Sequence, residues 1–249
     1  MERINLFSCP MDIATMGETV SWVADRTSKR QFTQHVVVNV AKLVNMRSDS
    51  ELAKSIRDCD LINIDGMGVV WAARFLGHRV QERVAGVDLF ERLVCMSAEK
   101  GFPVFFLGGT EEVVERTTAI LADRYPTLDV AGFHHGYFWD DEEKIVEKIH
   151  ASGARLLFVA ITSPKKEIFI DRWKDKLGVD FVMGVGGTFD VVAGAVRRAP
   201  EWMQKAGLEW LFRVIQEPRR MWRRYLITNS KFAVMLVKAK IAAALGSTA

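Results

Sequence analysis

The sequence predicts an α/β fold in which a largely parallel β-sheet is flanked by helices, followed by a helical, basic appendage at the C-terminus. Two observations lead to this fold class. Between about residues 36 and 183, short apolar runs alternate with helical patterns of roughly ten to fifteen residues, which is typical of right-handed βαβ crossovers. After residue 196 the pattern is helical throughout and the charge changes sign.

The expected strands are short, apolar and rich in β-branched or aromatic residues. They cover residues 36–40, 61–64, 103–107, 128–133, 155–160 and 179–183. The expected helices have apolar residues at helical spacing. They cover residues 41–57, 87–100, 111–124, 140–150 and 164–177, and a further helix begins at residue 67. Strands that alternate with helices in this way build a Rossmann-like sheet that is covered on both faces.

Charge divides the chain into two parts. Residues 1–196 contain 23 basic and 28 acidic side chains, a net charge of −5, whereas residues 197–249 contain 11 and 3, a net charge of +8. We therefore expect an α/β domain in residues 1–196 and a helical appendage in residues 197–249. Nucleic acid, acidic lipid and a phosphorylated substrate are all anionic partners that would suit the appendage.

The composition is that of a globular protein with a full core, since 49% of the 249 residues are hydrophobic and 26% are charged. The three cysteines have no C-x-x-C spacing, for which a reducing compartment is the simpler explanation. The N-terminus contains Glu2 and Asp12 without a continuous apolar stretch, so we expect no signal peptide. No apolar run approaches the ~18 residues of a spanning helix. These features predict a cytoplasmic protein.

The last segment predicts a basic amphipathic helix. Arg220, Arg224, Lys231 and Lys238 lie four or seven residues apart, on one side of a helix, with Trp222 as an interfacial aromatic residue. This pattern is typical of a helix that lies on an anionic membrane. The alternative is a C-terminal helix that packs on the domain and exposes a solvated basic face.

Asp65 is the first candidate for chemistry. It follows the expected strand 61–64, and open α/β sheets bind their ligands at the carboxyl ends of the strands. The next loop returns Arg83 toward a permissive Gly86. An acid and an arginine on successive loops indicate a base and an anion clamp. The alternative is that Asp65 caps the helix that follows it.

Three expected strand ends carry small residues that open onto a helix, at residues 107–110, 160–164 and 184–188. Such ends allow backbone amides and a helix dipole to approach a phosphate, so a nucleotide diphosphate is a natural ligand. None of the three matches G-x-G-x-x-G or G-x-x-x-x-G-K-[ST], and each alone is a weak signal.

Five arginines crowd into twelve residues of the appendage: Arg213, Arg219, Arg220, Arg223 and Arg224. A guanidinium group binds phosphate in bidentate fashion, and a pyrophosphate needs more than one. The cluster therefore suits a pyrophosphate substrate, a membrane surface, or both.

Patterns for metal and hydrolase chemistry are weak. Asp58-Cys59-Asp60 is formally a D-x-D motif, but it precedes its strand, on the edge opposite the expected ligand crevice, and we expect a surface turn. The five histidines form no H-x-x-x-H pair, and there is no G-x-S-x-G motif.

A series of motifs from about Asn5 to Tyr225 closely resembles the WecG/TagA/CpsF glycosyltransferases. The blocks are Val38-Asn39, Asp65-Gly66-x-Gly68, Glu82-Arg83-x-x-Gly86-x-Asp88-Leu89, Leu107-Gly108-Gly109, Gly136-Tyr137-Phe138, Pro164-Lys165-x-Glu167, Gly184-x-Gly186-Gly187-x-Phe189-Asp190-x-x-Ala193-Gly194, Arg198-Ala199-Pro200-x-Trp202, Gly207-Leu208-Glu209-Trp210-Leu211-x-Arg213 and Glu217-Pro218-x-Arg220.

The resemblance implies an inverting transfer of a hexose, an N-acetylhexosamine or its uronic acid from a UDP-sugar to a sugar on undecaprenyl diphosphate. The transfer would serve bacterial surface or exopolysaccharide assembly on the inner face of the cell membrane. The α/β domain would be catalytic, and the appendage would touch the anionic membrane surface. The expected partners are the UDP-sugar, the polyprenyl-diphosphate-sugar acceptor and that membrane, with no nucleic acid. An oligomer is compatible with the sequence, and no metal or other cofactor is expected.

The resemblance also implies roles for individual residues. Asp65 matches the general base proposed for the family, and Arg83 lies in the same pocket. Together with the glycine turns and the arginine cluster, the resemblance gives the residues expected to bind the donor: Asn39, Gly108, Gly109, Tyr137, Lys166, Gly186, Gly187, Asp190, Arg213, Arg220 and Arg223.

Two positions depart from the family pattern. Val37 stands where the family usually has threonine, and Lys166 stands where it has glutamine. Both face the sugar pocket in relatives, so a plain hexose or an acidic sugar is expected as donor in place of N-acetylmannosamine. Residues 34–44 look more like the exopolysaccharide glucosyltransferase branch than the teichoic-acid branch.

Two other functions remain as alternatives. A nucleic-acid-binding module would use the basic appendage, but the rest of the chain is acidic and lacks aromatic stacking platforms. A soluble nucleotide-sugar-modifying enzyme, such as an epimerase, shares a doubly wound sheet, but would need a dinucleotide fingerprint and a Tyr-x-x-x-Lys pair, and neither is present.

Overall fold

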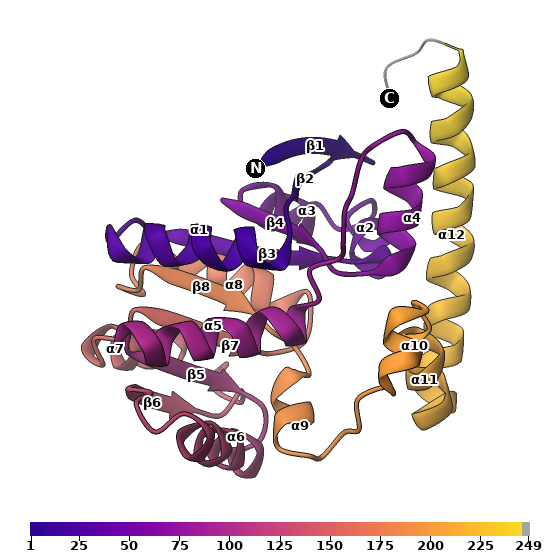
Figure 1. Ribbon diagram of the computed structural model, residues 1–249. Coiled ribbons are helices and arrows are strands. Elements are labelled where there is room, and N and C mark those ends of the chain that lie inside the picture. Colours follow the sequence, from indigo (N-terminus) through magenta and orange to yellow (C-terminus); the bar gives the residue numbers. More distant parts are fainter. Residues whose placement is uncertain (246–249) are drawn as a thin grey trace.

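A computed structural model describes residues 1–245, without the side chains of Arg220 and Ala244 (Figure 1). Its centre is a six-stranded sheet in the order β4-β3-β8-β7-β5-β6, in which every neighbouring pair is parallel. The strands are β3 (Thr33–Val38), β4 (Leu61–Ile64), β5 (Val104–Gly108), β6 (Val130–His134), β7 (Leu156–Ala160) and β8 (Phe181–Gly184). The predicted α/β, Rossmann-like fold class is confirmed.

Helices cover both faces of the sheet. One face carries α1 (Met16–Ser28), α5 (Gly86–Lys100) and α6 (Glu111–Arg124), and the other carries α7 (Glu142–Ala151) and α8 (Lys165–Trp173). Around the β4 edge lie β1 (Glu2–Leu6), β2 (Cys9–Ile13), α2 (Val40–Asn45), α3 (Ser50–Arg57) and α4 (Met67–Phe75). The chain ends in α9 (Thr188–Val192), α10 (Glu201–Lys205), α11 (Glu209–Gln216) and α12 (Pro218–Ala244).

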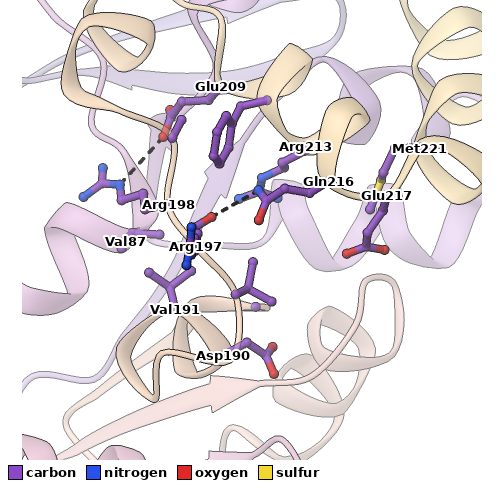
Figure 2. A pocket seen from close by; sticks show the side chains of 14 residues that line it. Val87, Asp190, Val191, Arg197, Arg198, Glu209, Arg213, Gln216, Glu217 and Met221 are labelled. Atoms are coloured by element: carbon purple, nitrogen blue, oxygen red, sulfur yellow. Dashed lines mark hydrogen bonds and ion pairs between the residues drawn. The ribbon is translucent and has the colours of Figure 1, made fainter.

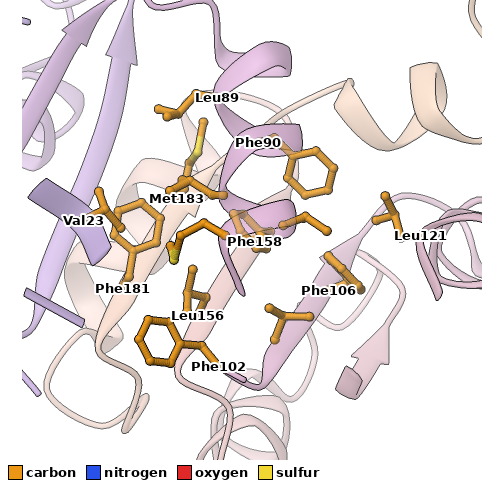
Figure 3. Close-up of a cluster of buried hydrophobic side chains, with 14 of the residues drawn as sticks. Val23, Leu89, Phe90, Phe102, Phe106, Leu121, Leu156, Phe158, Phe181 and Met183 are labelled. Carbon is orange, nitrogen blue, oxygen red and sulfur yellow. The ribbon is translucent and has the colours of Figure 1, made fainter. Parts of the chain in front are cut away.

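The core on the α5 side combines aliphatic side chains with packed phenylalanine rings (Figure 3). Phe90 of α5 packs edge-on against Phe158 of β7 with ring centroids 4.8 Å apart, and Phe106 of β5 stacks on Phe158 at 6.0 Å. Burial of each ring contributes ~2–3 kcal/mol, and such ring pairs add ~0.5–1.5 kcal/mol. Because strand side chains alternate, Phe105 and Leu157 enter the opposite core, so β5 and β7 are fixed from both faces.

The N-terminal hairpin of β1 and β2 has no counterpart among the expected elements. Its two-residue turn places Phe7 and Ser8 at φ 56° and 62°, which a type I′ turn requires. Asp12 forms two 2.8 Å hydrogen bonds with Arg3 and also accepts one from the backbone N–H of Ile62. This carboxylate therefore joins the hairpin to β4.

Most element boundaries agree with the prediction, but the helix expected over residues 41–57 is wrong. The chain forms α2 and α3 instead, because Asp49 accepts a 2.9 Å hydrogen bond from the N–H of Leu52 and starts a new helix. The first expected strand also ends two residues early, at Val38, because Asn39 caps α2. The helix expected over 164–177 ends at Trp173.

The long helix α12 packs one side on the α/β domain, alongside α2 and α4 (Figure 1). Phe232 and Met235 are buried there, and the rings of Phe232 and Phe7 lie 5.4 Å apart. Lys240 donates a 3.0 Å hydrogen bond to the carbonyl of Phe75. Within residues 1–245, no helix combines the length and the apolar character needed to cross a bilayer.

Candidate active site

The carboxyl edge of the sheet collects most of the predicted site residues. Asn39 follows β3, Asp65 follows β4, Gly108 ends β5, Tyr137 follows β6 and Gly186 follows β8. Because the six strands are parallel, their carboxyl ends meet at one edge, where α/β sheets bind ligands.

Asp65 is half-buried at this edge. The alternative interpretation, that Asp65 caps α4, is wrong. The N-cap of α4 is Gly66, and no side chain caps the helix. Asp65 Oδ1 instead accepts a 3.1 Å hydrogen bond from the N–H of Gly86, the first residue of α5. Burial raises the pKa of Asp65, against the effects of this hydrogen bond and of the positive charges on Arg83 and Arg213. A carboxylate with a raised pKa is a stronger base.

Arg83 forms an ion pair with Glu209, the first residue of α11. The other oxygen of Glu209 lies 3.7 Å from Nε of Arg198. Arg198 in turn donates two hydrogen bonds, of 2.5 and 2.8 Å, to the carboxylate of Asp88 in α5, and these bonds raise its pKa. A continuous series of charges thus connects the Asp65 edge to the appendage.

A cavity of about 240 Å³ lies between α9, the linker to α10, and the helices α11 and α12 (Figure 2). Its lining includes three arginines and three acids: Arg197, Arg198, Arg213, Asp190, Glu209 and Glu217. Pockets for whole drug-sized ligands occupy ~300–1,000 Å³, so this cavity has room for part of a nucleotide sugar, such as a diphosphate.

The cavity brings three of the predicted donor residues together, namely Gly187, Asp190 and Arg213. Sequence reasoning did not assign site roles to Arg198 or Glu209. The available signal was their place in two motif blocks, but neither residue follows a strand end, where ligands of α/β sheets bind.

Lys166 belongs to a buried ion cluster. Its ammonium lies 2.8 Å from Oε1 of Glu167, and the ammonium of Lys42 lies 3.0 Å from the same atom and donates a 2.7 Å hydrogen bond to the carbonyl of Val37. Burial opposes the ionisation of Glu167, but the two lysines outweigh it and lower the pKa of Glu167 to about 2. Burial and the charge of Lys42 lower the pKa of Lys166 to about 8. The Lys166 side chain is 5% exposed and crosses Gly184 at the end of β8.

The glycines after β5 have a steric role. Gly108 has φ 125°, and a Cβ there would lie 2.3 Å from the carbonyl oxygen of Ala160 in β7. The N–H of Gly136 donates a 2.8 Å hydrogen bond to the carbonyl of Gly109. This contact brings the loop of Tyr137, whose side chain is 71% exposed, against the glycine turn.

Asn39 lies beside the residue that follows Asp65, because a Cβ added to Gly66 would be 3.3 Å from the Cβ of Asn39. Asn39 accepts a 3.1 Å hydrogen bond from the N–H of Lys42 and so caps α2. Arg223 is exposed on α12 and does not line the cavity. The side chain of Arg220 lies outside the described residues.

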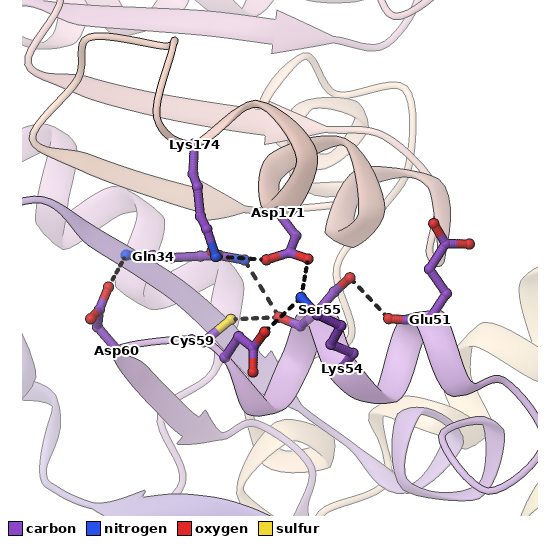
Figure 4. Close-up of polar contacts among 9 residues, drawn as sticks. Gln34, Glu51, Lys54, Ser55, Cys59, Asp60, Asp171 and Lys174 are labelled. Carbon is purple, nitrogen blue, oxygen red and sulfur yellow. Dashed lines mark hydrogen bonds and ion pairs between the residues drawn. The ribbon is translucent and has the colours of Figure 1, made fainter.

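The D-x-D motif lies at the amino end of β4 and takes part in a structural network (Figure 4). Asp60 accepts a 2.8 Å hydrogen bond from the N–H of Gln34, and Lys54 pairs with Asp58 at 2.8 Å and with Asp171 at 3.2 Å. Across the described part of the chain, no three His, Cys, Asp or Glu side chains form a group that could hold a metal ion.

The geometry agrees with a comparison against known families. A family model described as "Glycosyl transferase WecG/TagA/CpsF family" matches residues 4–245. The match spans the sheet, the Asp65 edge and the appendage through α12. The chain therefore belongs to the WecG/TagA/CpsF family of glycosyl transferases.

Proposed function

We propose that the protein transfers a hexose, an N-acetylhexosamine or its uronic acid from a UDP-sugar to a sugar on undecaprenyl diphosphate, with inversion, in bacterial polysaccharide assembly. The observation that carries the proposal is Asp65. It stands at the carboxyl edge of a parallel sheet, accepts the N–H of Gly86 and has a pKa raised by burial. Membership in a glycosyl transferase family supports it.

In the proposed reaction, the carboxylate of Asp65 removes the proton from the acceptor hydroxyl. The acceptor oxygen then forms a bond to the anomeric carbon from the face opposite UDP, while the bond from that carbon to the phosphate oxygen breaks and UDP leaves with the electron pair. General base catalysis of this kind contributes ~10²–10⁴-fold in rate.

The departing diphosphate needs positive partners. Arg197 and Arg213 line the cavity beside Gly187, where guanidinium groups and backbone amides would meet phosphate oxygens. No metal takes part in the proposed step.

We assign donor preference to Val37 and Lys166. The cluster of Lys42, Lys166 and Glu167 carries one excess positive charge beneath the edge, which favours an acidic sugar over a neutral one. Val37 packs against Gly86, whose N–H donates a hydrogen bond to Asp65. A Cβ added to Gly86 would lie 3.3 Å from Cγ2 of Val37.

The proposed membrane contact uses the side of α12 that faces away from the domain. Leu226, Val237 and Ile241 are 59%, 57% and 54% exposed there, and Lys231 and Lys238 are also exposed. Exposed apolar side chains beside lysines suit an anionic lipid surface, where the acceptor resides. Residues 1–196 would then be catalytic and residues 197–249 membrane-associating, at the inner face of the membrane.

The test is Asp65→Asn, assayed with a panel of UDP-sugars against a short-chain polyprenyl-diphosphate sugar. We expect turnover to fall by ~10²-fold or more while UDP binding, measured by calorimetry, is retained. Asp25→Asn, an exposed acid on α1 that pairs with Lys29, is the matched control. Turnover of the Asp65 variant within a few-fold of wild type would remove Asp65 from the mechanism. Thermal stabilisation by UDP but not by NAD separates this function from an epimerase.

A further inference from the structure

Glu209 uses both of its carboxylate oxygens to join two arginines. Oε2 pairs with Arg83 of the loop before α5, and Oε1 faces Arg198 of the linker. The side chains of Arg83, Glu209 and Arg198 are 16%, 25% and 25% exposed, so solvent screens them less than a surface pair. Arg198 is itself held by Asp88 of α5. Glu209 therefore fastens the start of α11 to the loop that supports Asp65.

The position of Glu209 is set by backbone packing two residues earlier. Gly207 has φ 71°, and a Cβ there would lie 2.9 Å from Cβ of Met67 and 3.1 Å from the ring of Trp71. Because only a glycine allows this close approach to α4, the first turn of α11 sits directly beside the loop of Arg83.

The loop of Arg83 is connected to Asp65 at two points. The N–H of Val84 donates a 2.8 Å hydrogen bond to the carbonyl of Ile64, the residue before Asp65, and the N–H of Gly86 donates to Asp65 itself. Arg83 directly precedes Val84 and its charge already favours the ionised form of Asp65, so the Asp65 carboxylate is a second partner for the Arg83 guanidinium. Such a pair would make Asp65 a weaker base.

We propose that Glu209 is a positioning residue that holds Arg83 and Arg198 together and thereby keeps Arg83 from forming an ion pair with Asp65. The inference rests on the proposed function of Asp65 as the base. Among the charged groups that act on Asp65, Arg83 and Arg213 favour its ionised form and Glu209 disfavours it. Loss of the Glu209 charge removes an acid that disfavours the ionised form of Asp65 and frees Arg83.

The direct test measures the pKa of Asp65 by ¹³C NMR of aspartate-labelled protein, without substrate. In Glu209→Gln we expect this pKa to fall below its wild-type value. The matched control is Glu201→Gln, an acid of α10 that pairs with Lys205 at 2.8 Å, and it should leave the pKa unchanged. If Glu209→Gln does not fold, Glu209→Asp, whose carboxylate is one methylene short of Arg83, takes its place.

A double-mutant cycle identifies the cause. Removal of the cation by Arg83→Gln should raise the pKa of Asp65 more in the Glu209→Gln background than in wild type, because Glu209 no longer occupies Arg83. In transfer assays, Glu209→Gln should lower kcat by about tenfold with little change in KM for the donor, and the acidic limb of the pH profile should move to lower pH.

An Asp65 pKa that is equal in wild type and Glu209→Gln, or equal responses to Arg83→Gln in both backgrounds, would overturn the inference. The NMR measurement needs no turnover, so it decides the role of Glu209 even if the protein transfers no sugar. Conversely, a pKa that shifts as expected in a protein without transferase activity would refute the proposed function alone.

Discussion

The buried cluster of Lys42, Lys166 and Glu167 makes a quantitative prediction about stability. Glu167 is the one carboxylate between two ammonium groups, and all three side chains are less than 10% exposed. The substitution Glu167→Gln keeps the shape of the side chain but leaves two buried cations without a counter-charge. Removal of one partner from a buried ion pair is strongly destabilising, at ~3–5 kcal/mol.

The pKa of Glu167 gives a second measure of the same interaction. Its pKa falls from the ordinary 4.5 to about 2, and at about 1.4 kcal/mol per pKa unit this corresponds to about 3 kcal/mol. Because the folded-state pKa is depressed, the stabilisation is fully present above pH 4.5 and is lost as the pH falls through about 2. The buried charge of Lys166, in contrast, lowers stability at neutral pH. Its folded-state pKa of about 8 lies below 10.5, so stability rises as the pH increases from about 8 to 10.5.

The assay is urea unfolding followed by circular dichroism between pH 3 and pH 10. Wild type should lose stability below pH 4.5, whereas Glu167→Gln should be about 3 kcal/mol less stable at pH 7 and should lack the part of the acid loss that Glu167 causes. Lys166→Met removes the excess cation and should be at least as stable as wild type at pH 7. A Glu167→Gln variant with wild-type stability at pH 7 would show that the pairing contributes nothing and would refute the reasoning.

Three further outcomes are expected. The double substitution Leu226→Gln and Val237→Gln should reduce binding to anionic vesicles by about tenfold or more, because burial of each side chain contributes ~1.5–3 kcal/mol. Unchanged co-sedimentation with the vesicles would show that the outer side of α12 does not make the membrane contact. Gly108→Ala should lower the free energy of unfolding by more than Gly153→Ala, because both have positive φ but only Gly108 meets backbone atoms; equal melting temperatures would contradict this. Lys166→Gln should shift donor preference away from acidic sugars in a competition assay. An unchanged order of preference among the UDP-sugars would show that Lys166 does not determine donor specificity.

The sheet and its carboxyl edge could be predicted because their signals are local. Short apolar runs ended by Asp65 or by Gly108 define strands, and parallel pairing then brings their ends together without any knowledge of side-chain contacts. The N-terminal hairpin could not be predicted in this way. Its turn consists of Phe7 and Ser8, which lack the glycine or asparagine that usually marks positive φ.

The ion pairs of the site depend on long-range geometry. Arg83 and Glu209 are 126 residues apart in the sequence, and no periodicity connects them. Lys166 and Glu167 look like exposed positions of a polar helix, yet both are buried, and Lys42 from α2 pairs with the same oxygen of Glu167 as Lys166 does. Charged residues are rarely buried unless paired, and the partner Lys42 lies on a different helix far away in the sequence, so no local pattern predicts this burial.

The side of α12 that touches the domain imposes a practical constraint on anyone who prepares this enzyme. Truncation of the chain before residue 218 would remove Phe232 and Met235 from this apolar cluster. Their apolar partners, among them Phe7, would then be exposed to solvent. When α12 is retained, the apolar side chains on its outer side, including Leu226 and Val237, stay exposed to solvent. A mild detergent or a lipid nanodisc would cover this outer side while the inner side of α12 remains packed on the domain. Membrane mimetics of this kind therefore suit purification better than truncation.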